Sequence, residues 1–217
     1  ATGTCAAPPF GRTAAGIQRY QYLDNIFLSF DPKDTRRDAT FKASYSKSVY
    51  EQTGKLEMVG THVHKNIGYT NDAGVHQFIG DFMYYRLPLV YLSLAEIANY
   101  EGNGADVAKY INLVRKRAYG SNWNEATYGY TAGSFTANEL AILGEKDREF
   151  LQEGQRWHDL RRMTLTKDGK HLVFCPEANP KKNGRPILDE AQSHKLLWPI
   201  DKNVMNSDKE LKQTPGY

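Results

Sequence analysis

Residues 86–120, RLPLVYLSLAEIANYEGNGADVAKYINLVRKRAYG, predict two helices joined by a tight turn. Pro88 is tolerated in a first helical turn, where its missing N–H would be unpaired in any case. From Leu89 to Tyr100 the residues are apolar nearly all round, which predicts a buried helix. EGNG (101–104) ends it, and an amphipathic helix follows with apolar residues at i, i+3, i+4 and i+7, namely Val107, Tyr110, Ile111 and Val114. Two helices joined so closely form an antiparallel hairpin.

A second helical stretch, GEKDREFLQEGQRWHDLRR (144–162), holds ten charged side chains among nineteen residues. Just upstream, TANE (136–139) fits a capping box, in which Thr136 caps a helix and Glu139 reaches back. An apolar series runs from this cap through the charged stretch, and it comprises Leu140, Leu143, Phe150, Leu151, Trp157 and Leu160. We therefore expect one long, packed helix.

The charges of this long helix fall in two neighbouring rows of opposite sign. On helical spacing one row holds Glu145, Glu149 and Glu153, and the other holds Arg148, Gln152 and Arg156. A catalytic alternative makes two of the glutamates an acid–base pair, which needs carboxylates about 5–10 Å apart across a cleft. Arginine partners keep carboxylates ionised, which disfavours a general acid. We predict a structural ion-pair network.

Glu96 is a separate charge on the otherwise apolar first helix of the hairpin. A carboxylate in such a place needs a cation, because an unpaired buried charge is costly. Arg86, Arg115 and Arg117 are the nearest candidates in the sequence. We expect a buried ion pair here and no catalytic role.

Composition excludes several classes of protein. Among 217 residues the net charge is +3 and the basic residues form no concentrated stripe, so no nucleic-acid partner is predicted. No apolar run is long enough to span a bilayer, and ATGTCAAPPFGRT at the start lacks the features of a signal peptide. Cys5 and Cys175 could pair, but two thiols fix neither a disulfide framework nor a compartment.

The chain divides into three regions of one domain. Residues 1–80 are rich in loop-forming residues, and KLEMVGTHVHKNIGY (55–69) alternates enough to predict a short strand or hairpin. Residues 81–163 form the helical core, and residues 164–217 are irregular. The predicted fold class is mainly α: a helical hairpin and a long helix, with extensive irregular loops and short strands.

Motifs for catalysis and for cofactors are missing. G-x-S-x-G, the P-loop, H-E-x-x-H and G-x-G-x-x-G do not occur. His62, His64 and His76 lie near one another in sequence, but no Cys or Asp completes a recognisable metal-ligand spacing. No catalytic residue, cofactor or metal is predicted.

Three stretches, in this order, resemble the C-terminal half of the SusD/RagB family of glycan-binding outer-membrane lipoproteins. They are the hairpin quoted above, EKDREFLQEGQRWHDLRRM (145–163) and LLWPIDKNVMNSDKELKQTPGY (196–217). DPKDTRRDATF (31–41) also resembles an upstream family segment. Lys146, Asp201 and Thr214 depart from the usual family residues, and none of them is a residue that chemistry would require.

The resemblance implies tetratricopeptide-like helix pairs in a SusD-like α-α superhelix. It also implies a non-enzymatic protein on the outward face of the outer membrane, which binds oligosaccharide and delivers it to a SusC-like TonB-dependent transporter. Family members carry a lipid anchor and are longer than this chain, so we expect a fragment of a longer protein. Two alternatives stay open: a glycan-active enzyme such as a glycoside hydrolase, and a purely structural helical interaction module.

Aromatic side chains with neighbouring amides are the candidate ligand-binding residues. Sugars present C–H faces that stack on aromatic rings, while amides bond the hydroxyls. The loop SNWNEATYGYTAGSF (121–135) offers Asn122, Trp123, Asn124, Tyr128 and Tyr130. On the resemblance, the N-terminal part adds Tyr45, Tyr50 and Tyr69. The competing interpretation is that the rings of the loop pack it onto the helices.

Overall fold

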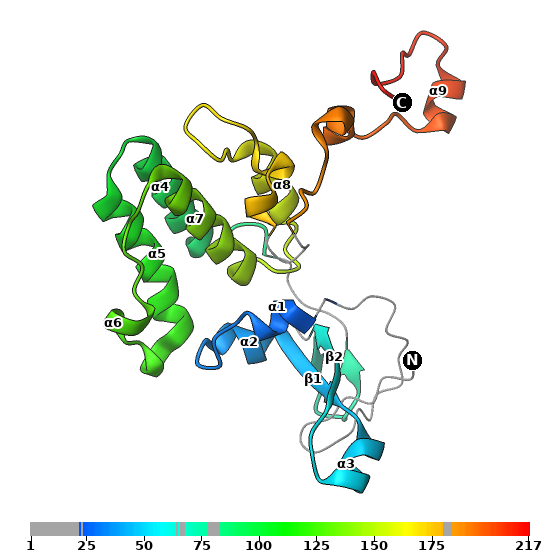
Figure 1. Cartoon of the computed structure of the whole chain (residues 1–217). Helices are drawn as coiled ribbons and strands as arrows, with labels where there is room; N and C mark the ends of the chain where they lie inside the picture. The colour runs from blue at the N-terminus through cyan, green and yellow to red at the C-terminus, as the bar shows by residue number, and fades with distance from the viewer. Residues whose placement is uncertain (1–21, 23, 64, 66–67, 78–82, 180–183) are drawn as a thin grey trace.

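The helical hairpin is the centre of the fold. A computed structural model describes residues 22, 24–63, 65, 68–77, 83–179 and 184–217 (Figure 1). Within it α4 (Leu87–Tyr100) and α5 (Gly104–Tyr119) run antiparallel, with Pro88 in the first turn of α4. The turn between them depends on Gly102, whose φ of 75° favours glycine, and on Asn103, whose side chain caps α5. The predicted hairpin and the mainly helical fold class are confirmed.

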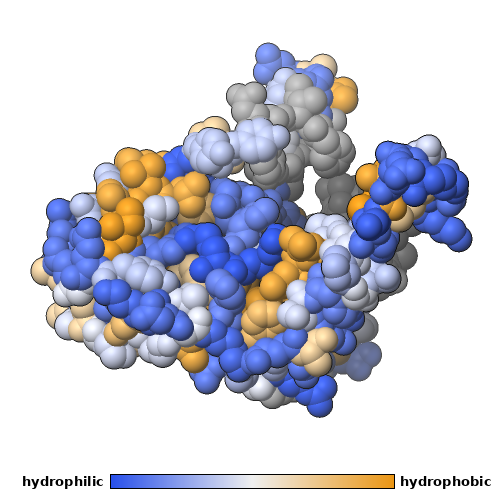
Figure 2. Space-filling model, turned by 90° about the horizontal axis from the view of Figure 1, so that it is seen from above, coloured by the Kyte–Doolittle hydropathy of each residue, from blue (hydrophilic) through white to orange (hydrophobic). Residues whose placement is uncertain are grey.

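The sequence predicted that helix α4 is buried on all sides. The structure shows that this is wrong, because one face of the helix is exposed. Leu92, Ala95 and Ala98 are buried, because their face packs against α5 and α7. Three apolar side chains of α4 stay more than half exposed: Leu87 (58%), Val90 (52%) and Ile97 (54%). Figure 2 shows hydrophobic surface on the side of the molecule that the hairpin forms. The apolar composition of α4 thus exceeds what the described part of the chain covers.

The predicted long helix is divided into α7 (Phe135–Glu149) and α8 (Gln155–Arg162). Gln152 (φ 62°) and Gly154 (φ 77°) adopt left-handed backbone conformations that no continuous α-helix contains. The break turns α8 back, so that Leu160 joins the core together with the downstream η2 (Leu172–Phe174). Helical periodicity alone did not reveal the break, because both helices keep their apolar faces toward one core.

The start of α7 also differs from the predicted capping box. Ser134 is the N-cap, and its hydroxyl accepts a hydrogen bond from the backbone N–H of Ala137. Thr136 lies inside the helix and donates to the carbonyl of Leu165 at 2.7 Å. Glu139 is buried and accepts from the Asn99 amide at 2.9 Å. The helix begins two residues earlier than predicted because Ser134 offers the same kind of capping oxygen.

The N-terminal part holds more regular structure than its loop-forming composition predicted. Its helices are α1 (Asp24–Leu28), α2 (Thr35–Thr40) and α3 (Lys47–Thr53). The strand expected within residues 55–69 is β2 (Met58–Val63), which pairs antiparallel with the upstream β1 (Phe41–Tyr45) and places Phe41 opposite Val63. A second small ladder joins β3 (Tyr69–Thr70) to β4 (His76–Gln77).

The other helical elements of the described chain are short turns joined by irregular segments. After α5 come η1 (Gly120–Asn122) and α6 (Glu125–Tyr128); after α8 and η2 come η3 (Pro176–Ala178), η5 (Glu190–Leu196) and α9 (Lys202–Ser207). The segment with α9 stands away from the helical core (Figures 1 and 2). It is closed on itself, because the Tyr217 hydroxyl donates to the carbonyl of Leu197 at 2.9 Å.

One apolar core joins the hairpin to the helices that follow. Its buried side chains come mainly from α4, α5, α7, α8 and η2, and they include Leu92, Val107, Ile111, Ile142, Leu143, Leu160 and Leu172, with Met163 directly after α8. Cys175 is buried beside them, and its thiol donates to the carbonyl of His171 at 3.3 Å. Among the described helices none is long and apolar enough to cross a membrane.

Candidate functional site

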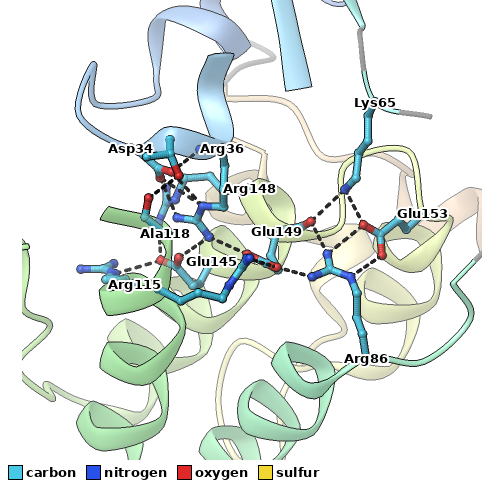
Figure 3. A network of polar contacts seen from close by, with 12 residues as sticks. Asp34, Arg36, Lys65, Arg86, Arg115, Ala118, Glu145, Arg148, Glu149 and Glu153 are labelled. Carbon is cyan, nitrogen blue, oxygen red and sulfur yellow. Dashed lines mark hydrogen bonds and ion pairs between the residues drawn. The ribbon is translucent and has the colours of Figure 1, made fainter. Parts of the chain in front are cut away.

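Arg36 is the cation at the centre of the charged network (Figure 3). It lies on α2, whose N-cap is Asp34, and the Asp34 carboxylate binds its guanidinium through Nε and Nη2. From there Nη1 reaches α7, 2.8 Å from Glu145 Oε1 and 3.1 Å from Glu149 Oε2. All four side chains are buried. The network therefore connects the N-terminal part to α7.

Glu145 is the most enclosed carboxylate of the network. Besides Arg36 it pairs with Arg115 of α5 and with Arg148, one turn further along α7, each at 2.9 Å. Burial alone would raise the pKa of Glu145, but the three arginines together lower it to about 2. The side chain is therefore ionised over the whole physiological pH range.

Glu149 and Glu153 extend the network toward the start of α4. Arg86 binds both carboxylates, and its Nη2 lies 2.8 Å from Glu153 Oε1. Arg117 lies 2.6 Å from Glu149, and Lys65 pairs with Glu153. Burial alone would raise the pKa of Glu149, but Arg86, Arg36 and Arg117 lower it. The partners of both glutamates thus come from other elements, and the i,i+3 pair expected along the helix occurs at Glu145 and Arg148.

Glu96 belongs to a second cluster and not to the arginines expected from the sequence. Its carboxylate pairs with Arg162 of α8 and lies 3.7 Å from Nζ of Lys146. Lys146 in turn donates to Asp159 at 2.9 Å. The expected partners were wrong because the break after α7 brings Arg162 back beside α4, while Arg86, Arg115 and Arg117 serve the other cluster.

Arg156 also leaves the predicted row of the helix. It pairs with Asp147 of α7 and donates to the carbonyl of Ala178 at 2.9 Å. Arg156 thus connects α8 to α7. In one continuous helix it would instead have lain in a row with Arg148 and Gln152.

Glu139 and Asp147 are carboxylates of α7 whose pKa is raised by burial, and Asp147 is paired with Arg156 while Glu139 has no such ion pair among the described residues. Burial raises the pKa of Glu139 to about 7, and the hydrogen bond from Asn99 only partly offsets this. A pKa near 7 suits a general acid. Glu139 is completely enclosed, however, so a substrate cannot reach it. The described carboxylates of α7 therefore fit structural roles.

Metal ligands do not gather in the described part of the chain. No group of three or more His, Cys, Asp or Glu side chains there could hold a metal ion. Of the histidines considered above, His64 lies outside the described residues, as does Cys5.

Two of the predicted ligand-binding rings form a cluster with a third that the sequence did not single out. Tyr119, at the end of α5, stacks on Tyr128 with 4.1 Å between ring centroids. Trp123 meets Tyr119 edge to face at 6.2 Å. Trp123, Tyr128 and Tyr119 are each half-buried. We call these three residues the ring cluster; it presents aromatic surface beside α6 and is held by ring–ring contacts.

The remaining predicted residues of the loop have structural partners. Tyr130 packs against the core, and its hydroxyl donates to Asn138 at 2.7 Å. Asn124 caps α6 by accepting from the N–H of Thr127. Asn122 donates to the carbonyl of Lys33 at 3.4 Å. The amides expected to bond sugar hydroxyls thus shape the loop, while the ring cluster keeps its surface.

The N-terminal tyrosines do not join the ring cluster. Tyr45 ends β1, Tyr50 lies on α3, and Tyr69 is half-exposed on β3. In Figure 1 α3 and α6 lie at different ends of the molecule. Among the described residues the predicted rings therefore do not combine into a single aromatic surface.

Comparison with known proteins identifies the family. The sequence profile of the SusD family matches residues 12–217. The chain belongs to the SusD family. A SusD superfamily protein from Bacteroides fragilis NCTC 9343 is 58% identical, and its crystal structure matches with a TM-score of 0.87 over 93% of this chain and 41% of that one. NanU of Bacteroides fragilis is 33% identical, with a TM-score of 0.65 over 89% of this chain and 38% of that one.

Two further proteins are more distantly similar to this chain. The SusD-like protein P2 of Formosa agariphila is 26% identical in an alignment of 205 residues that covers 88% of this chain and 39% of that protein. Surface glycan-binding protein A from Bacteroides uniformis has the same fold, with a TM-score of 0.62 at 18% identity over 98% of this chain and 45% of that one. The chain thus spans less than half the length of each of these proteins.

Arg36, Lys65 and Arg162 are network residues that the sequence did not predict. Arg36 lies in DPKDTRRDATF, the segment that resembles an upstream SusD-family motif, so its Asp34-x-Arg36 spacing was the available signal. Lys65 and Arg162 give no such signal, because their partners are fixed by how distant elements pack.

Proposed function

We propose that this chain binds oligosaccharide at the cell surface as part of a SusD-family protein. Membership of the family, together with the ring cluster on the described surface, supports this function. One protein of the same fold, from Bacteroides uniformis, is named a surface glycan-binding protein. The ring cluster is the single structural observation on which the proposal rests.

The geometry of the ring cluster suits a sugar. Aromatic faces contact the C–H surface of a sugar ring, and their own packing limits the side-chain freedom that binding would otherwise remove. Tyr119 is contacted by both other rings, so the cluster is ordered before ligand arrives. The elements α5 and α6 hold it from two sides.

Binding without cleavage is the second part of the proposal. Glycoside hydrolysis needs one carboxyl group that holds a proton and a second one across a cleft. Glu145 and Glu149 are buried, paired with arginines and held ionised, so neither can donate a proton. Burial raises the pKa of Glu139 to about 7, but this side chain has no access to substrate. Burial also raises the pKa of Asp147, whose carboxylate is held in an ion pair with Arg156.

The partners and the location are proposed from the family. Residues 1–217 form a C-terminal region of a longer lipoprotein, which is attached to the outer membrane on its outward face. That protein delivers bound oligosaccharide to a SusC-like TonB-dependent transporter. Co-purification of a TonB-dependent protein with the tagged full-length lipoprotein from solubilised membranes tests this partnership, and its absence from the purified fraction contradicts it.

A calorimetric titration tests the binding function directly. The chain is titrated with a panel of plant and host oligosaccharides, and each mixture is afterwards assayed for newly released reducing ends. We expect saturable heat with at least one oligosaccharide and no release of reducing ends. Absence of heat across the panel contradicts glycan binding. Release that disappears on replacing one carboxylate establishes an enzyme instead.

A further inference from the structure

A cavity of about 650 Å³ lies between α1, the end of α7 and the start of α8. Its volume falls within the range of about 300–1,000 Å³ that is usual for small-molecule sites. The ring cluster does not contribute to it, so the cavity is a separate feature. Its lining combines apolar walls with polar groups, and each set limits what could fill it.

The apolar walls are mostly aromatic. They consist of Tyr22, Ile26, Phe30, Phe150, Leu151 and Trp157. Flat aromatic faces at several sides of a cavity favour an occupant that has flat apolar faces of its own. A linear, strongly hydrated ion would gain nothing from such walls.

Three lining side chains carry a buried polar atom without a hydrogen-bond partner in the described part of the chain. These atoms are Oδ1 of Asp147, Nε1 of Trp157 and Oδ2 of Asp159. A buried polar group that lacks a partner is costly, and natural proteins leave few of them. These atoms are enclosed by protein, so an occupant of the cavity would bond them only after the side chains turn toward it. Two acceptors and one donor would then gain partners.

The charges around the cavity are already matched. Asp147 pairs with Arg156, and the other oxygen of Asp159 accepts from Lys146 at 2.9 Å. Arg148 pairs with Glu145. A cationic ligand would face three basic side chains and an anionic ligand two carboxylates, so an uncharged occupant fits best. Hydroxyl groups suit it, because each can donate to a carboxylate and accept from an indole N–H.

The backbone around the cavity supports a site that is kept open. Gly144 lies inside α7, where glycine costs helix stability, and a Cβ added to it would meet nothing within 4 Å. Gln152, also in the lining, is the one non-glycine residue with positive φ among the described residues. Such strain gathers at ligand sites more often than elsewhere.

We propose that this cavity binds a single sugar residue. A sugar ring has apolar C–H faces, carries no charge and bears hydroxyl groups, which are the three properties that the lining favours. The cavity would be a second carbohydrate site, distinct from the ring cluster. The inference rests on the cavity and not on the proposed function, because its lining shares no residue with the cluster. On binding, Trp157 turns its N–H toward a hydroxyl oxygen.

Gly144→Leu is the decisive variant, because its side chain grows into open space within the cavity. Wild-type chain, Gly144→Leu and the matched control Gly144→Ala are titrated calorimetrically with glucose, galactose, mannose and N-acetylglucosamine. We expect one of these sugars to bind the wild type at millimolar concentration or below, at least about tenfold weaker binding by Gly144→Leu, and near-normal binding by Gly144→Ala. Both variants should melt no earlier than the wild type, since either side chain favours helix more than glycine does.

Trp157→Phe provides a second measurement, because it keeps an aromatic wall and removes the indole N–H. We expect it to weaken the same sugar severalfold. Failure of the wild type to bind any of the four sugars overturns the inference, as does unchanged binding by Gly144→Leu. Oligosaccharide binding that is weakened by Trp123→Ala but not by Gly144→Leu would identify the ring cluster as the site and exclude the cavity. Binding that is weakened by Gly144→Leu but not by Trp123→Ala would exclude the ring cluster.

Discussion

Arg36 Nη1 lies 3.1 Å from Glu149 Oε2, and both side chains are buried although 113 residues separate them in sequence. The pair fixes α2 against the end of α7. Taking two charges out of water is costly, and further hydrogen bonds must offset that cost. Here Asp34, Glu145, Arg86 and Arg117 supply them.

Glu149→Gln should destabilise the chain strongly. The substitution leaves Arg36, Arg86 and Arg117 without their shared counter-charge, and breaking a buried pair from one side costs about 3–5 kcal/mol. Urea unfolding followed by circular dichroism measures the loss. The matched control is Glu210→Gln on the exposed C-terminal segment, which should change the free energy of unfolding by less than about 0.5 kcal/mol.

Unchanged stability of Glu149→Gln, with binding of oligosaccharide abolished, would show that this carboxylate serves ligand and not the fold. Retained binding by whatever fraction of the variant stays folded agrees with the structural role.

The helices could be read from the sequence because their signals are local. Pro88, the turn at Gly102 and the apolar spacing of α5 all lie within the segment that they define. The break between α7 and α8 was not predicted: Gly154 was the local signal for it, and Gln152 adopts a left-handed conformation although it is not a helix breaker. This conformation depends on tertiary packing, and the spacing of apolar residues along the sequence does not indicate it.

In the candidate sites, too, features with local signals were predicted and features that depend on tertiary packing were not. Trp123 and Tyr128 were predicted as exposed rings, while Tyr119 was missed because it ends a helix and looked like part of its face. Tyr130 lies in the same loop but packs on the core, and nothing in its neighbours distinguishes it. The cavity beside Gly144 is formed by elements distant in sequence, so only a structure reveals it.

Acid should unfold the chain partly through Glu145. Its pKa is about 2 in the folded chain against an ordinary value of 4.5, so the folded state favours the ionised form. The corresponding stability is fully present above pH 4.5 and is lost as the pH falls from 4.5 toward 2. Urea midpoints measured from pH 7 down to pH 2.5 should show this fall.

Glu145→Gln separates the contribution of Glu145 to acid unfolding from the contributions of the other carboxylates. The variant should be several kcal/mol less stable at pH 7, because Arg36, Arg115 and Arg148 lose a charge partner, and its stability should depend less on pH below 4.5. A variant with the slope of the wild type would mean that Glu145 does not drive the acid transition.

Glu139 should change the stability with pH in the opposite direction to Glu145. The pKa of Glu139 rises to about 7 in the folded chain, so the folded state binds more protons than the unfolded one between pH 4.5 and 7. Stability from this group is therefore present below pH 4.5 and is lost as the pH rises through 7. Glu139→Gln imitates the protonated carboxyl and keeps an oxygen for Asn99.

At pH 8 the Glu139→Gln variant should be more stable than the wild type, by on the order of 2 kcal/mol, and at pH 4 the two should be nearly equal. Thermal melting at both pH values measures this. A variant that is less stable than the wild type at pH 8 would contradict the predicted destabilisation by the ionised carboxylate.

The ring cluster provides the test of where oligosaccharide touches this surface. Trp123→Ala and Tyr128→Ala each remove one aromatic face, and a lost stacking contact costs about 1–2 kcal/mol, or roughly tenfold in affinity. Tyr128→Phe is the matched control, because it keeps the stack on Tyr119 and loses only the hydroxyl. Each variant is titrated calorimetrically with the oligosaccharide that the wild type binds, and its melting temperature is recorded so that unfolding is not mistaken for lost binding. Equal affinity of both alanine variants and the wild type would mean that the rings only pack the loop, and would leave the cavity beside Gly144 or the N-terminal tyrosines Tyr45, Tyr50 and Tyr69 as the site.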